Sequence, residues 1–191
     1  EEALVQAERV GYPVMIKATS GGGGRGIRRC DDAEDLKSQY PRVISEATKA
    51  FGSAEVFLET CILNPKHIEV QVLGDSQGNV VHLYERDCSI QRRNQKLIEI
   101  APSPQISEEQ RSYLGEMAVA AARYVGYESA GTVEFLLSGE DIYFMEMNTR
   151  IQVEHTITEQ ITGVDIVREQ IRVAERKELS YKQEERKGGE Q

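Results

Sequence analysis

Strands that follow one another in hairpins constrain the fold of this chain more than any other feature. The run 67–73 is polar at odd positions and apolar at even ones through Val72, the period-2 pattern of a half-buried strand, and it ends on Leu73. Turn-forming residues 74–79 separate this run from a second one at 80–84, which predicts an antiparallel hairpin. Residues 131–137 and 142–147 predict another hairpin. Adjacent hairpins favour an α+β fold with an antiparallel sheet over a doubly wound parallel sheet.

Helices are predicted where capping residues flank apolar residues at helical spacing. Asp31 or Asp32 can cap a helix that ends at Gly52, and Pro41 should kink or split that helix. Ser107 begins a later helix as part of a capping box. Short strands are expected around the first helices, at 13–17, 27–30 and 55–59.

The pattern places a domain boundary near Cys61, between a small first unit and a larger sheet unit. Residues 182–191 contain no apolar residue and two adjacent glycines, so they are predicted to form a solvated tail. The expected parts are therefore 1–61, 62–181 and 182–191. The first helical pattern has no cap residue in front of it, and we expect the chain to be a piece of a longer protein.

Composition excludes several classes of protein. The 191 residues carry a formal net charge of −9, and a coat for nucleic acid would need a basic face. No apolar run approaches the roughly 18 residues of a membrane span. The three cysteines form no CxxC pair, so we expect reduced thiols rather than a disulfide framework or a zinc site. These features favour a cytoplasmic protein, or a mitochondrial or plastid one in a eukaryote.

A glycine-rich run at residues 21–26 is the first candidate for chemistry. It formally matches GxGxxG, but it precedes a strand instead of opening a helix, and it lacks the Lys-Ser/Thr ending of a P-loop. The remaining interpretations are a mobile surface loop or, as we favour, a loop that folds over polyphosphate with its bare backbone N–H groups. Lys17, just before the loop, is a natural phosphate partner.

A second candidate is the run from Glu146 to Glu154. If it is extended, residues 146, 148, 150, 152 and 154 share one face, which mixes oxygen ligands with a cation. The hairpin can bring Glu134 beside Glu146, and two carboxylates with the amide oxygen of Asn148 suit Mg²⁺. The alternative is an ordinary half-buried strand with one wet face.

A third candidate is residues 85–96, which carry four cations within an acidic protein. A basic surface loop or an RNA-binding patch would have the same charge. The run has no aromatic residue for base stacking, so binding of small anions fits better. His67 heads an alternating strand that can face the same site.

Together these residues resemble the ATP-grasp domain of biotin carboxylase, the unit that catalyses the first half-reaction of biotin-dependent carboxylases. The resemblance runs from the first residues to about Gln183. It implies a small lid subdomain and a larger antiparallel-sheet subdomain. The matching stretches are 16–17 with 21–26, 64–71, 85–96 and 146–155.

The resemblance implies an ATP site in which Lys17 and the lid loop hold the phosphates. His67 and Gln91 would line the nucleotide site, with Asn94 where the family most often has His. The remaining nucleotide contacts would be Gly22, Gly23, Gly24 and Arg25 of the lid loop, and Glu59, Thr60 and Ile62 for the adenine.

The resemblance also implies a metal and bicarbonate site. Mg²⁺ or Mn²⁺ would be held by Glu134, Glu146 and Asn148. Bicarbonate would be held by Lys96, Arg150 and Val153. Glu154 would be the general base for bicarbonate, and Arg150 would also stabilise the enolate-like biotin.

The implied activity is the ATP- and Mg²⁺-dependent carboxylation of biotin with bicarbonate, through carboxyphosphate. The implied partners are bicarbonate, a biotin carboxyl carrier domain and a carboxyltransferase subunit or domain, in a protein whose full-length form is a homodimer. The hint of subtype points to pyruvate, 2-oxoglutarate or acyl-CoA carboxylases. We expect the isolated chain to be inactive or weakly active.

Two other functions remain open at this point. One is another ATP-grasp ligase that makes an acyl phosphate, such as a carbamoyl-phosphate or purine-pathway enzyme, although the face from Arg150 to Glu154 argues against it. The other is a nucleotide-binding piece that does not turn over.

Overall fold

The computed structural model describes residues 1–20, 26–92 and 95–183. The chain divides into two compact units, each of which is described by itself. The first comprises Glu1–Leu63 with Arg92–Gln95, and the second comprises Asn64–Gln91 with Lys96–Gln191. The boundary drawn near Cys61 from the sequence stays a prediction.

The first unit is a small antiparallel sheet covered by two helices. Its strands are β1 (Val14–Ala18), β2 (Ile27–Cys30) and β3 (Val56–Thr60), in the order β2-β1-β3. The helices are α1 (Glu2–Val10) and α2 (Ala33–Phe51). Their buried side chains meet those of the strands in one core, made of Ala7, Val14, Ile16, Cys30, Leu36 and Val43.

Helix α2 begins and ends where predicted. The predicted alternative that Pro41 splits it into two helices is wrong, because residues 33–51 form one helix. Asp32 accepts hydrogen bonds from the backbone N–H groups of Glu34 and Asp35, each at 2.9 Å, and Gly52 ends the helix at φ 72°. Pro41 lies on the exposed side of the single helix. Burial of Leu36 before the proline and of residues 43 and 47 after it outweighs the one backbone hydrogen bond that proline removes.

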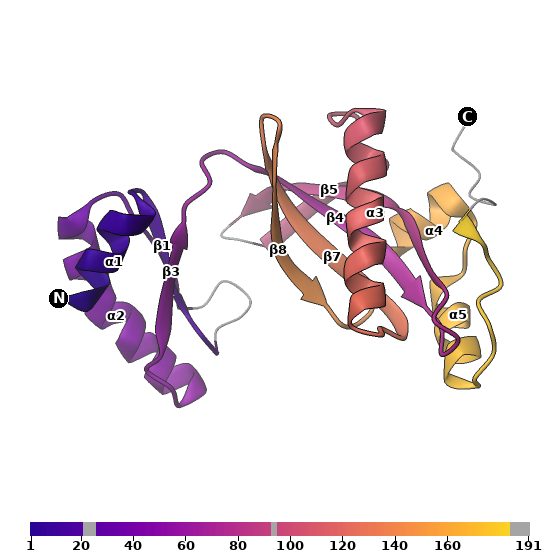
Figure 1. The fold of residues 1–191 in the computed structure, drawn as a ribbon, viewed down its shortest axis with the longest axis horizontal. Coiled ribbons are helices and arrows are strands. Elements are labelled where there is room, and N and C mark those ends of the chain that lie inside the picture. The colour runs from indigo at the N-terminus through magenta and orange to yellow at the C-terminus, as the bar shows by residue number, and fades with distance from the viewer. Residues whose placement is uncertain (21–25, 93–94, 184–191) are drawn as a thin grey trace. The chain divides into compact units, whose positions relative to one another are not determined.

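The second unit is built on a five-stranded sheet in the order β6-β5-β4-β7-β8 (Figure 1). The strands are β4 (Lys66–Gly74), β5 (Val80–Arg92), β6 (Gln95–Ile100), β7 (Ser129–Ser138) and β8 (Asp141–Asn148). The β4–β5, β4–β7 and β7–β8 pairs are antiparallel, so the α+β class and both predicted hairpins are confirmed.

Helices cover both faces of this sheet. Helix α3 (Glu108–Tyr124) lies across one face, and the predicted capping box of Ser107 with Gln110 begins it (Figure 1). It approaches β5 closely at Gly115, where an added Cβ would lie 2.4 Å from the His82 ring. Helices α4 (His155–Thr162) and α5 (Ile166–Ala174) follow β8, and α5 helps to form the core on the opposite face.

The alternation of strand β4 has a different meaning from the one predicted. Ile68, Val70 and residue 72 pack in the core under α3, as expected of the apolar face. The polar face is buried as well, since Glu69 and Gln71 have no exposed surface. A strand with polar side chains on a buried face requires partners for them, and these partners form the candidate site.

Three further predictions from the sequence concern the cysteines, the C-terminal residues and membrane spans. Cys30, Cys61 and Cys88 are free thiols. Gln183, at the start of the predicted tail, accepts a hydrogen bond from the His82 backbone N–H at 2.8 Å and donates to its carbonyl at 3.2 Å. Among the described residues, no helix has the length and apolar character needed to cross a membrane.

Candidate active site

A row of charged residues crosses four strands on the face of the sheet opposite α3. Arg86 of β5 lies directly opposite Glu69 of β4, Glu69 lies opposite Glu134 of β7, and Glu134 lies opposite Glu146 of β8. Directly opposed side chains share a face, and like charges in such positions repel. Three carboxylates in one row therefore need cations beside them.

Lys96 supplies one of these cations. Its ammonium forms ion pairs with Glu69, with Glu134 at 3.3 Å and with Glu154 at 2.7 Å. Burial lowers the pKa of Lys96, but Glu69 and Glu154 outweigh it and raise this pKa above its ordinary value. Burial raises the pKa of Glu154, and the hydrogen bond from Lys96 reverses the effect and lowers it. At neutral pH the pair is an ammonium beside a carboxylate.

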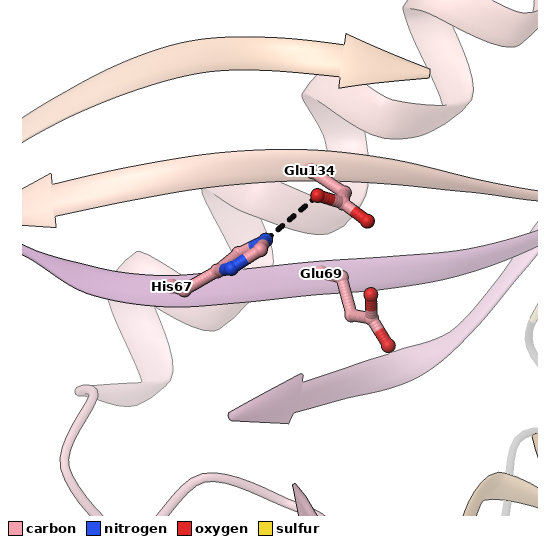
Figure 2. A group of neighbouring side chains, drawn as sticks. All are labelled: His67, Glu69 and Glu134. Atoms are coloured by element: carbon pink, nitrogen blue, oxygen red, sulfur yellow. Dashed lines mark hydrogen bonds and ion pairs between the residues drawn. The ribbon is translucent and has the colours of Figure 1, made fainter. Parts of the chain in front are cut away.

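Glu134 is the most heavily hydrogen-bonded carboxylate of the row. Its Oε1 accepts from Asn148 Nδ2 at 2.8 Å and from Gln152 Nε2 at 3.1 Å, and its Oε2 lies 2.7 Å from His67 Nε2 (Figure 2). Burial raises the pKa of Glu134, but the hydrogen bond from His67 and the charge of Lys96 prevail and bring it down to about 2. This carboxylate is ionised throughout the physiological range.

The imidazole of His67 has a defined tautomer. Gln91 Nε2 lies 2.7 Å from His67 Nδ1 and donates to the Cys88 carbonyl at 2.8 Å. Because that carbonyl can only accept, the atom facing His67 is the donating amide nitrogen, and Nδ1 must accept from it. The ring therefore carries its proton on Nε2, where it donates to Glu134.

Two groups of potential metal ligands occur among the described residues. His67, Glu69 and Glu134 form the first, in which the ligand atoms lie within 4.8 Å of one another (Figure 2). Glu69, Cys88 and Glu99 form the second. In the second group, burial raises the pKa of the Cys88 thiol and that of the Glu99 carboxyl, which makes ionisation of either side chain less favourable than in water.

The predicted continuous strand face from Glu146 to Glu154 is wrong beyond Asn148. Strand β8 ends at Asn148, and Glu154 stands immediately before α4. Arg150 is exposed, and its Nη1 donates to the Ile151 carbonyl at 3.2 Å. Val153 is 91% exposed. The turn of the backbone after β8, rather than a period-2 face, brings Glu154 to Lys96.

The residues predicted for the nucleotide fall into three groups. His67 and Gln91 lie together in the second unit. In the first unit Lys17 forms an ion pair with Glu59 on the neighbouring strand, and Thr60 ends that strand just before Ile62. The other predicted contacts lie outside the described residues: Gly22, Gly23, Gly24, Arg25 and Asn94.

Three residues at the centre of the site have no role predicted from the sequence. These are Glu69, Arg86 and Gln152, all buried and joined by hydrogen bonds. The sequence contains a pattern that could have pointed to Glu69 and Arg86. Glu69 lies on the polar side of an alternating strand, and Arg86 is the first of the four cations in the run 85–96.

The chain is similar to known proteins over nearly its whole length. The family model for the carbamoyl-phosphate synthase L chain, ATP binding domain, matches residues 1–182. The 2-oxoglutarate carboxylase small subunit of Hydrogenobacter thermophilus is 59% identical over 186 residues, which are 97% of this chain and 39% of that protein. The pyruvate carboxylase of Bacillus subtilis is 59% identical over 172 residues, 90% of this chain and 15% of that protein.

A solved structure is also similar over nearly the whole chain. It is the biotin carboxylase domain dimer of the H. thermophilus 2-oxoglutarate carboxylase, in complex with MgADP, ADP and bicarbonate. The TM-score is 0.95 at 58% identity, and the match covers 98% of this chain and 42% of that chain. The predicted ATP-grasp fold is thereby confirmed, while the chain spans less than half the length of these relatives. The chain belongs to the family of carbamoyl-phosphate synthase L chain ATP-binding domains, and within it is similar to biotin carboxylase domains.

Proposed function

We propose that the protein containing this chain carboxylates biotin on a carrier domain, using bicarbonate and ATP, with carboxyphosphate as the intermediate. One observation carries the proposal: the Lys96 ammonium lies between Glu154 and Glu134, 2.7 Å from the first and 3.3 Å from the second. This arrangement offers a cation for an anionic substrate and an ionised base beside it. The similarity to the H. thermophilus domain, whose structure contains MgADP and bicarbonate, supports the same assignment.

In this proposal Lys96 and Arg150 bind bicarbonate together with the backbone of Val153. Glu154 takes the bicarbonate proton, and a bicarbonate oxygen then attacks the γ-phosphorus of ATP while ADP leaves with the electron pair of the broken P–O bond. The lowered pKa of Glu154 keeps the base ionised before the proton arrives. Among the residues that the structure describes, the exposed guanidinium of Arg150 forms no ion pair like those of Lys96, so it suits a mobile anion or the biotin enolate.

A divalent cation is proposed at Glu134, Glu146 and Asn148. Carboxylate and amide oxygens are the ligands that Mg²⁺ and Mn²⁺ accept, and Glu146 is exposed directly opposite Glu134. Asn148 uses its amide nitrogen toward Glu134, which leaves its oxygen for the cation. Glu69 differs from Glu134 in that each of its two oxygens pairs with a full cation, Oε1 with Arg86 and Oε2 with Lys96. When bound, the cation would offset negative charge on the phosphate oxygens.

For ATP itself, we assign phosphate binding to Lys17 and the loop after it, and nucleotide contacts to His67 and Gln91. The Lys17–Glu59 pair keeps the ammonium on its strand until a phosphate competes for it. Hydrogen bonds to Glu134 and Gln91 hold the imidazole ring of His67 in place. The other nucleotide contacts stay predictions: residues 22–25, Thr60, Ile62 and Asn94.

The partners follow from the reaction. Biotin must arrive on a carrier domain and leave for a carboxyltransferase subunit or domain, and we propose a homodimer because the similar H. thermophilus domain is a dimer. The identity of the acceptor among pyruvate, 2-oxoglutarate and acyl-CoA substrates is not assigned. Cytoplasmic or organellar location stays a prediction.

The experiment is an assay of ADP release by the full-length protein with Mg·ATP. Bicarbonate and biotin are added separately and together, and ammonium or glutamine replaces biotin in a parallel series. We expect release to depend on bicarbonate and biotin, and Glu154→Gln to lower it by about 10²–10⁴-fold, the usual contribution of a general base. Glu175→Gln is the matched control, because Glu175 pairs with Lys177 on the surface. Stimulation by ammonium or glutamine but not by biotin would contradict the proposal and favour another acyl-phosphate ligase.

A further inference from the structure

We propose that Arg86 is a positioning residue of this site, which holds Glu69 and Gln152 and through them sets the places of Lys96 and Glu134. Arg86 has no exposed surface and would touch neither ATP nor bicarbonate. The effect of Arg86 on catalysis rests on the proposed function. The effect of Arg86 on the geometry of the site is independent of that function.

The guanidinium of Arg86 uses all of its donor directions. Nε donates to Glu69 Oε1 at 2.6 Å. Nη2 donates to Gln152 Oε1 at 3.1 Å. The remaining hydrogen bonds go to Gln71 Oε1 at 2.9 Å and Thr158 Oγ1 at 2.8 Å from Nη1, and to Thr132 Oγ1 at 3.4 Å from Nη2.

These acceptors come from four parts of the second unit. Gln71 and Glu69 lie on β4, Thr132 on β7 and Thr158 on α4, while Gln152 lies in the turn between β8 and α4. One planar group therefore joins two strands to the helix and turn that carry Glu154. A planar fork with fixed donor directions can do this, and the single ammonium of a lysine cannot.

Two of the acceptors, Gln152 and Glu69, also interact with a candidate catalytic or metal-binding side chain through their second polar atom. Gln152 accepts from Arg86 with Oε1, which turns its Nε2 toward Glu134 Oε1 at 3.1 Å. Glu69 accepts from Arg86 with Oε1 and pairs with Lys96 through Oε2. Without Arg86, the Gln152 oxygen would lose its donor, and the amide would be held less firmly against the carboxylate of Glu134. Glu69 would also lose the buried cation that balances it, and would draw Lys96 away from Glu154.

The test compares Arg86→Met and Arg86→Lys with Arg111→Met in the full-length protein. Arg111 is a matched control because it is also a largely buried arginine of the same unit with a buried glutamate partner, Glu85, outside the candidate site. Two readouts do not depend on turnover. One is Mn²⁺ affinity in the presence of ADP, measured by electron paramagnetic resonance. The other is hydrogen exchange of the Gln152 side-chain amide, followed by NMR.

The expected result is a loss of Mn²⁺ affinity of about 10–100-fold in Arg86→Met, the usual effect of removing a residue that orients a ligand. The Gln152 amide should exchange faster in the same variant, and Arg86→Lys should not restore either property. kcat/KM for Mg·ATP should fall in the same variant, whereas Arg111→Met should leave all three quantities near wild type. Folded Arg86→Met protein with wild-type Mn²⁺ affinity and wild-type Gln152 exchange would overturn the inference.

Gln152→Leu keeps the test decisive if Arg86→Met does not fold. It removes the link to Glu134 while the Arg86–Glu69 pair stays intact, so it should lower Mn²⁺ affinity by a similar factor, and wild-type affinity would again overturn the inference. Failure of the proposed function has a different signature. In that case wild-type protein would show no biotin-dependent ADP release, yet Mn²⁺ affinity and Gln152 exchange would still respond to Arg86→Met.

Discussion

Lys96 illustrates how single residues hold this site together. Three carboxylates within ion-pair distance of one ammonium would repel one another if that ammonium were absent. Arg86 balances Glu69 from the other side, so the row contains compensating charge at each position where a carboxylate is buried. Buried charges of this kind are costly unless they are paired and hydrogen-bonded, and their retention is better explained by chemistry than by stability.

The depressed pKa of Glu134 gives a prediction about stability and pH. Its folded-state pKa is about 2, against an ordinary value of 4.5. A lowered pKa contributes stability that is present above pH 4.5 and is lost as the pH falls toward 2. The advantage of wild-type protein over Glu134→Gln in free energy of unfolding should therefore shrink by roughly 2 kcal/mol between pH 5 and pH 3.

Urea unfolding in the presence of a chelator would measure this difference at each pH. Glu109→Gln, an exposed substitution on α3, provides the reference for an amide at a solvent-facing position. A wild-type advantage that stays constant over the interval would show that Glu134 is not held ionised by His67 and Lys96.

Helix ends and hairpins form where the sequence predicts them, because their signals act between residues that are close in sequence. The capping box at Ser107, the cap at Asp32 and the glycine at 52 sit at the predicted helix ends, because each acts on backbone groups within one turn. The hairpins follow from period-2 patterns and turn residues that are close in sequence.

Long-range pairing explains what the sequence could not predict. Glu69 faces Arg86 from 17 residues away and Glu134 from 65, so nothing near Glu69 indicates that its polar face is buried. Strand β6 and helix α4 are not predicted by the sequence patterns: β6 begins at the end of the basic run 85–96, and α4 begins directly after the run from Glu146 to Glu154. Glu154 was assigned a role from the resemblance, but its approach to Lys96 depends on the turn after Asn148.

The capping box predicts the stability of α3. Ser107 Oγ accepts from the Gln110 backbone N–H at 3.1 Å, and the Gln110 side chain accepts from the Ser107 N–H at 3.0 Å. Ser107→Ala should lower the free energy of unfolding by about 1 kcal/mol, the usual value of such a cap. Ser112→Ala, at an exposed position of the same helix, should change it by less than about 0.5 kcal/mol. Chemical denaturation of the two variants checks this, and equal losses would mean that the cap does not stabilise the helix.

At the scale of the whole molecule, an acidic protein is proposed to bind anionic substrates. With a formal net charge of −9, general electrostatic attraction for ATP or bicarbonate is not expected. Binding must then depend on placed cations: Lys17 in the first unit, and Lys96 and Arg150 in the second. The antiparallel sheet of the second unit brings Glu69, Arg86, Glu134 and Glu146 onto one face, and the turn after β8 adds Glu154. Distant parts of the sequence supply one site in this way.

Transfer of oxygen from bicarbonate to phosphate tests the central claim most directly. If a bicarbonate oxygen attacks the γ-phosphorus, cleavage of the resulting carboxyphosphate leaves that oxygen on the phosphate. The full-length protein is incubated with Mg·ATP, biotin and ¹⁸O-labelled bicarbonate, and the released phosphate is analysed by mass spectrometry. The account predicts ¹⁸O in the phosphate in step with ADP release, and loss of both in Glu154→Gln but not in Glu175→Gln. Release of ADP with unlabelled phosphate would mean that water is the nucleophile, and would contradict it.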